Sequence, residues 1–219
     1  MITFNDVKNN DSIKTYIAKA DESLIALGYT EHSFAHVMKV ATSAKYILTT
    51  LGYSQKDIEL AQIASYLHDI GNLINRVDHA QSSALLAFHI LKDMGASPDE
   101  IATVVTAIGN HDEITAVAVN SVAAALILSD KTDVRRSRVR NTDVHNFDIH
   151  DRVNYAVKKS TIKINEEHTE ISLNININPK YCTVMDYFEI FLGRMILCRK
   201  AAEKLGLTFH LNVNNQQIL

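Results

Sequence analysis

The chain has 219 residues, of which 22 are Lys or Arg and 25 are Asp or Glu, so its formal net charge is −3. This length suits one large domain, or one domain with an appendage, and is enough to bury a substantial core. The small net charge excludes the strongly basic surface of proteins that bind nucleic acid polymers or acidic membranes. With 47% hydrophobic and 21% charged residues, the composition is typical of a globular protein and not of a disordered one.

The sequence gives no indication of a signal peptide, a membrane span or a disulfide. The first residues lack the apolar stretch of a signal peptide, and the longest apolar run, near residues 122–128, is too short to span a bilayer. Cys182 and Cys198 lie sixteen residues apart on one predicted helix, too far from each other to form a disulfide. The sequence therefore predicts a soluble cytoplasmic protein with no membrane partner.

Apolar residues recur at intervals of three and four through the first part of the chain, which predicts a series of amphipathic helices. Ser97 and Glu100, on either side of Pro98, form a capping box at the start of one of them. Gly28, Gly71 and other glycines stand where a left-handed residue would close a helix. The predicted helices span about 10–27, 31–51, 55–70, 78–94, 98–110 and 119–135.

The pattern changes after about residue 150, where apolar and polar residues alternate as they do in half-buried strands. Such strands are predicted near 161–164, 171–177 and 207–213, with a long helix over about 183–205 between the second and the third. The predicted fold is mainly α: a helical bundle over residues 1–150, followed by a small antiparallel ββαβ element over 151–219 that packs on it. An exposed edge of this sheet would allow a homodimer.

Histidine and aspartate side chains recur on five successive predicted helices. Taken singly, each fits a buried core histidine or a charge at a helix end. The ordered set favours a metal site, because a carboxylate after an apolar run is costly unless it is paired or bound to a metal. Imidazole and carboxylate together suit iron, manganese or zinc better than calcium. The residues are His36, His68, Asp69, His79, His111 and Asp130.

Over about residues 20–140 this set resembles the HD-domain metal-dependent phosphohydrolases, with His68 and Asp69 in an HDIG string as the eponymous pair. The resemblance implies an HD-type helical domain with two divalent metal ions, iron before manganese, zinc, cobalt or magnesium. One ion would take His36, His68, Asp69 and Asp130. The other would take Asp69, His79 and His111, so that Asp69 bridges the two.

The sequence also departs from the family. Asn72 stands where the family often has lysine, and Asn110 stands where many members have a second histidine. The GYP string of the cyclic-di-GMP phosphodiesterase branch is missing after His111, so that substrate is not assigned.

The resemblance implies a hydrolase that cleaves a phosphate ester or anhydride of a small molecule, a nucleotide first of all, through a metal-activated hydroxide. His68 and Asp69 are the expected catalytic residues, and the expected partner is a small phosphorylated substrate. Two alternatives stay open. One is an HD-fold di-iron oxygenase, which uses the same ligand types. The other is a non-catalytic metal-binding or dimerisation module.

Residues 131–141 hold five cations and one anion. If the helix continues past Asp130, Lys131, Arg135 and Arg138 share one face and could bind substrate phosphates. A solvated helix end is the alternative. Partners for the N–H groups of the ligating histidines are expected among His32, Asp112 and Glu113. The remaining histidines, such as His150, are interpreted as structural or exposed.

Overall fold

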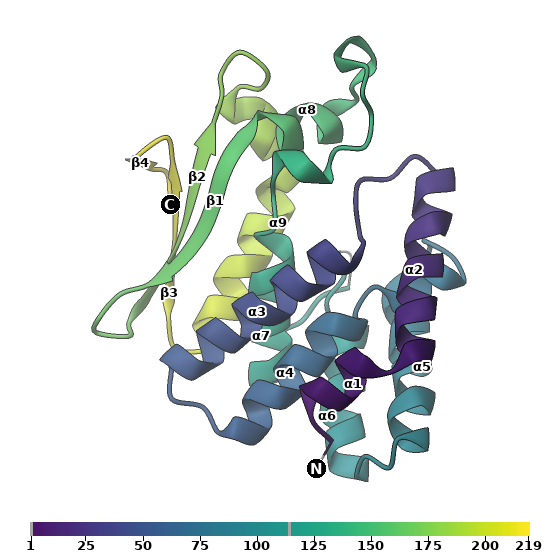
Figure 1. Cartoon of the computed structure of the whole chain (residues 1–219). Coiled ribbons are helices and arrows are strands. Elements are labelled where there is room, and N and C mark those ends of the chain that lie inside the picture. Colours follow the sequence, from purple (N-terminus) through teal and green to yellow (C-terminus); the bar gives the residue numbers. More distant parts are fainter. Residues whose placement is uncertain (1, 114) are drawn as a thin grey trace.

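The computed structural model describes residues 2–113 and 115–219. The N-terminal two thirds of the chain form a bundle of helices (Figure 1). These helices are α1 (Phe4–Asn9), α2 (Asp11–Ala26), α3 (Phe34–Thr50), α4 (Gln55–Leu67), α5 (His79–Asp93), α6 (Pro98–Gly109) and α7 (Ser121–Lys131). Each helix predicted in this part is present, and the capping box of Ser97 and Glu100 begins α6 as expected. The short helix α1 has a capping box of its own and was not predicted.

Helix α7 differs from its prediction at the C-terminal end. The predicted helix over 119–135 stops at Lys131, so Arg135 and Arg138 do not continue it. The Thr132 hydroxyl donates to the carbonyl of Leu128 (2.6 Å), and the carboxylate of Asp133 is wholly buried among charged partners. Pairing these buried charges offsets the backbone hydrogen bonds that a longer helix would gain. The prediction that Lys131, Arg135 and Arg138 share one helix face was therefore wrong.

The C-terminal third holds a small sheet and one long helix. Two short 3-10 turns, η2 (Arg136–Arg138) and η3 (Val144–Asn146), lead to α8 (Ile149–Ala156), a helix that was not predicted. The strands β1 (Val157–Ile164), β2 (Glu170–Ile177), β3 (Thr208–Val213) and β4 (Gln216–Gln217) form a sheet in the order β1-β2-β3-β4. Helix α9 (Val184–Lys204) connects β2 to β3.

The pairing of β3 corrects a prediction. Strand β1 pairs with β2 antiparallel, but β3 pairs with β2 parallel, with Ile171 opposite Phe209 and Leu173 opposite Leu211. The ββαβ element is therefore a mixed sheet and not an antiparallel one. The reason is the long helix α9, which carries the chain back to the starting end of the sheet, as a parallel connection requires.

Helix α9 joins the two parts of the molecule. It lies between the sheet and α7 in Figure 1 and contacts both. Helix α9 contacts β3, and the apolar residues of β2, β3 and α9 belong to one continuous hydrophobic core with the bundle helices. The C-terminal element is thereby fixed against the end of α7, which carries Asp130 and Lys131. None of the described helices is both long and apolar enough to cross a membrane.

Candidate metal centre

The six histidine and aspartate residues of the ordered set meet at one place in the bundle. They come from five places along the chain, and each is buried. His36 lies in the first turn of α3, His68 and Asp69 follow α4, and His79 begins α5. The other two follow α6 and end α7; they are His111 and Asp130.

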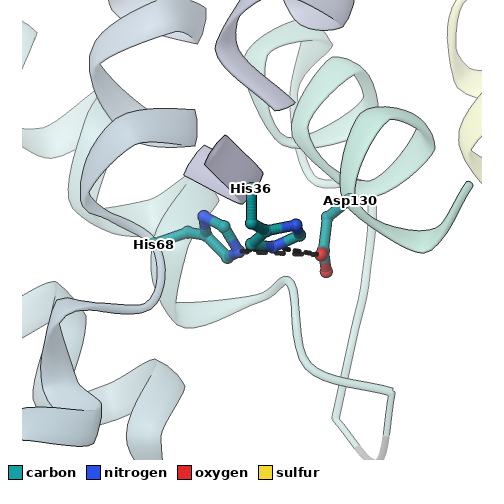
Figure 2. A group of neighbouring side chains, drawn as sticks. All are labelled: His36, His68 and Asp130. Carbon is teal, nitrogen blue, oxygen red and sulfur yellow. Dashed lines mark hydrogen bonds and ion pairs between the residues drawn. The ribbon is translucent and has the colours of Figure 1, made fainter. Parts of the chain in front are cut away.

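Three of these side chains form a tight group, which Figure 2 shows. The Nε2 atoms of His36 and His68 lie 3.4 Å apart, and Oδ1 of Asp130 lies 3.3 Å and 3.6 Å from them. Ligand atoms bound at roughly 2.0–2.2 Å to one ion lie at separations of about 3 Å from one another. The three atoms are therefore spaced as ligands of a single metal ion would be.

Asp69 stands between this group and a second one. Its Oδ2 lies 3.1 Å from Nε2 of His68 and 3.6 Å from Nε2 of His36, while its Oδ1 lies 3.5 Å from Nε2 of His79. Together with His68 and His111 it also forms a second group of potential ligands. One carboxylate oxygen thus faces each side, which is the arrangement that a bridging ligand needs.

The four imidazole rings are all held in the same sense. The Nδ1 atom of each ring lies within hydrogen-bond distance of an acceptor, which leaves Nε2 of each ring as the nitrogen available to a metal ion. Three acceptors are backbone carbonyls and one is a carboxylate. They are Asp133 Oδ2 for His36 (2.8 Å), Ser65 O for His68 (2.8 Å), Arg76 O for His79 (3.2 Å) and Ile108 O for His111 (2.6 Å).

The electrostatics of the centre favour a bound cation. Burial opposes a charge on His68, yet the carboxylates of Asp69 and Asp130 outweigh burial and raise the pKa of His68 to about 10. Burial lowers the pKa of His79 and His111, so both rings are neutral and able to ligate. The carboxylates thus draw positive charge into a buried place, and the nitrogen and oxygen donors fit a divalent transition metal.

Asp133 is the important residue that the sequence analysis missed. Its buried carboxylate accepts from His36 Nδ1, and it lies 2.9 Å from Lys39 Nζ and 3.0 Å from Arg135 Nε. Burial would raise the pKa of this carboxyl, but His36 and Arg138 hold it well below its usual range. None of the expected partners, His32, Asp112 or Glu113, occupies this position. The sequence feature that could have identified Asp133 is its position three residues after Asp130.

The predicted phosphate-binding cations separate in the structure. Lys131 and Arg138 line a cavity beside the centre, but Arg135 does not. Instead Arg135 pairs with Asp133 and donates from Nη2 to Glu31 (2.8 Å), which links the segment after α7 to the chain before α3. Arg135 therefore joins these two segments and does not lie where it could bind a substrate phosphate in this cavity.

The cavity beside the centre has a volume of about 260 Å³. Asp69, His79, His111 and Asp130 form its base. Helices α8 and α9 supply further walls, so the C-terminal third of the chain takes part in the site. The additional charged and polar residues that line it are Tyr29, Thr30, His32, Arg76, Glu113, Lys131, Arg138, Asp148, His150, Asp151, Asn154 and Arg194. His150 is exposed, as predicted, and it also lines the cavity; the helix α8 that carries it was not predicted.

Asn72, the departure after HDIG, supports the centre directly. Its amide donates to the backbone carbonyl of Asp69 (2.8 Å) and to Asp69 Oδ1 (3.1 Å), and its own oxygen accepts from Arg76 (3.3 Å). The amide thereby fixes the oxygen of Asp69 that faces His79.

Gly71 is required by a close approach between two segments of the site. A Cβ there would lie 2.3 Å from the carbonyl oxygen of His79 and 2.4 Å from the amide nitrogen of Ser83. The sequence predicted a left-handed backbone conformation at Gly71, and this prediction was wrong. Gly28 does adopt that conformation. The close contact lets the HDIG turn lie directly against the first turn of α5, which carries His79.

We expect Gly71→Ala to destabilise the fold by at least about 1–3 kcal/mol, because backbone atoms of α5 must move to admit the methyl group. Urea unfolding measures this. Gly193→Ala is the matched control: nothing lies within 4 Å of its Cβ position in α9. That control should gain up to about 1 kcal/mol from better helix propensity. An unchanged unfolding free energy in Gly71→Ala would contradict the close approach.

The chain is similar to known proteins over much of its length. The family model described as HD domain matches residues 33–190. Protein MJ1020 of Methanocaldococcus jannaschii, itself uncharacterized, is 24% identical over 187 residues, which cover 75% of this chain and 72% of that protein. A crystal structure of a predicted HD superfamily hydrolase from an uncultured Thermotogales bacterium shares 26% identity and a TM-score of 0.45, over 57% of this chain and 67% of its own. Because the family model covers well over half of its length, the chain belongs to the HD domain family.

Proposed function

We propose that the protein is a metal-dependent phosphohydrolase that cleaves a phosphate ester or anhydride of a small molecule such as a nucleotide. The observation that carries this proposal is the buried cluster of His36, His68, Asp69 and Asp130, in which the two Nε2 atoms lie 3.1–3.6 Å from the nearest carboxylate oxygens, beside a cavity. Divalent ions held there would activate a water molecule and offset charge on the phosphoryl oxygens. His79 and His111 would complete a second ion site around Asp69.

The charge of the cavity supports an anionic substrate. Four cations and five carboxylates line it, a net charge of −1, and two divalent ions would change this to +3. Lys131 lies 2.8 Å from Asp130, next to the expected ion site. Arg138 is buried at the cavity and held by the carbonyls of Glu31 and Asp133 (2.9 and 3.0 Å). Both can present a fixed positive charge to the phosphoryl group without needing to reorganise.

The test is a turnover screen on protein loaded with manganese or iron, using p-nitrophenyl phosphate, bis(p-nitrophenyl) phosphate and nucleotides. We expect phosphate release that requires the metal, stops with a chelator and continues without dioxygen in the manganese form. Turnover that strictly requires dioxygen would support the di-iron oxygenase instead. Bound metal with no turnover of any phosphate compound would support a non-catalytic module.

A further inference from the structure

A row of alternating charges leads outward from the centre along one wall of the cavity. Lys131 Nζ lies 2.8 Å from Oδ2 of Asp130, and Oε1 of Glu113 lies 3.7 Å from the same nitrogen. On its other side, Oε1 of Glu113 lies 2.5 Å from Nε of Arg194. The order of contacts places Lys131 next to the centre and Arg194 one ion pair farther out.

Arg194 is a feature of this chain beyond the family match. It lies on α9, and the family model ends at residue 190. Its guanidinium stacks over the ring of Phe191, 4.4 Å from the centroid, and both residues line the cavity. Stacking holds the guanidinium plane in place while leaving its donors available.

The present partner of Arg194 leaves hydrogen-bonding capacity unused. Nε of Arg194 is buried, and among the described residues no acceptor takes an aligned hydrogen bond from it. The contact with Glu113 is therefore a charge contact only. Glu113 keeps 31% of its side chain exposed, so its carboxylate can turn into water at little cost. A phosphoryl group could take its place and receive two parallel N–H donors from the guanidinium.

We infer that Arg194 binds a second phosphoryl group of the substrate, one that is not attacked, and that Glu113 holds the guanidinium in position until this group replaces it. The substrate class is then a diphosphate or longer anhydride rather than a simple monoester. This inference rests on the proposed function, because it takes the attacked phosphoryl group to lie at the metal centre beside Lys131.

The test compares two probes on the metal-loaded protein by isothermal titration calorimetry: inorganic phosphate and methylenediphosphonate, a non-hydrolysable analogue of pyrophosphate. Wild type should bind the diphosphonate more tightly. Arg194→Gln should weaken diphosphonate binding at least about tenfold, as expected for loss of charge-assisted hydrogen bonds, and leave phosphate binding within about twofold. Arg199→Gln, an exposed position on the same helix, is the control and should match wild type.

Glu113→Gln separates binding from a merely structural ion pair. If the ion pair between Glu113 and Arg194 only stabilises the cavity wall, Glu113→Gln and Arg194→Gln should weaken diphosphonate binding alike. That result would overturn the inference. Our account expects Glu113→Gln to bind the diphosphonate at least as tightly as wild type, because a competing anion is gone. Equal affinities of wild type and Arg194→Gln would also overturn it. If the loaded wild type binds neither probe, the proposed function fails and the inference with it. Metal content measured before and after titration identifies any loss of ions to the probe.

Discussion

Replacing Asp69 with alanine is expected to remove metal binding and catalysis together. Oδ2 of Asp69 faces His36 and His68, and its Oδ1 faces His79, so one substitution removes an oxygen from each half of the centre. Because bound metal supplies several kcal/mol of transition-state stabilisation, kcat/KM should fall at least about 1000-fold.

The measurement for Asp69→Ala is the metal content per chain together with the rise in Tm on adding metal, which should disappear. Asp93→Ala, an exposed aspartate at the end of α5, is the matched control and should retain both. Circular dichroism establishes that each variant is folded. An Asp69→Ala protein that keeps its metal and its turnover would contradict the assignment of this residue.

Asp133→Asn is expected to weaken metal binding by about 10- to 100-fold while leaving all six candidate ligands in place. The Asp133 carboxylate accepts from Nδ1 of His36 and so orients the ring and raises the basicity of its Nε2. The amide has nearly the same shape but no charge, so it holds the ring less firmly. It also leaves the neighbouring Lys39 and Arg138 without their anion, which should lower the unfolding free energy by about 3 kcal/mol.

Arg135→Gln separates the effect of Asp133 on stability from its effect on metal affinity. Arg135 pairs with the same carboxylate but is absent from the cavity lining, so its loss should cost some stability and leave metal affinity and KM unchanged. Competition with a fluorescent chelator measures the affinities. If Asp133→Asn binds metal as tightly as wild type, the support of His36 by Asp133 does not matter to the centre.

Local sequence patterns predicted the elements whose formation depends mainly on residues close together in the chain. Helix periodicity and the capping box at Ser97 located the helices, and the ordered set of histidines and aspartates indicated a shared site, where His36, His68 and Asp130 do lie together. Strand alternation likewise located β2 and β3, because every second residue of each strand is buried.

The features that the sequence did not predict depend on contacts between segments that lie far apart in the chain. Helix α7 ends early because Asp133 pairs with residues from α3, which no local pattern contains. Gly71 must be a glycine because backbone atoms at the start of α5 lie where its Cβ would be, and not because its own φ is positive. The participation of α8 and of Arg194 in the cavity follows from the way α9 returns to α7, and the sequence carries no marker for it.

Metal content, measured by elemental mass spectrometry on wild-type protein purified without a chelating tag, tests the central claim most directly. Our account predicts about two divalent ions per chain, one on each side of Asp69, whose two carboxylate oxygens face His36 and His68 on one side and His79 on the other. A protein that contains no metal, and regains none when iron, manganese or cobalt is added, would contradict it.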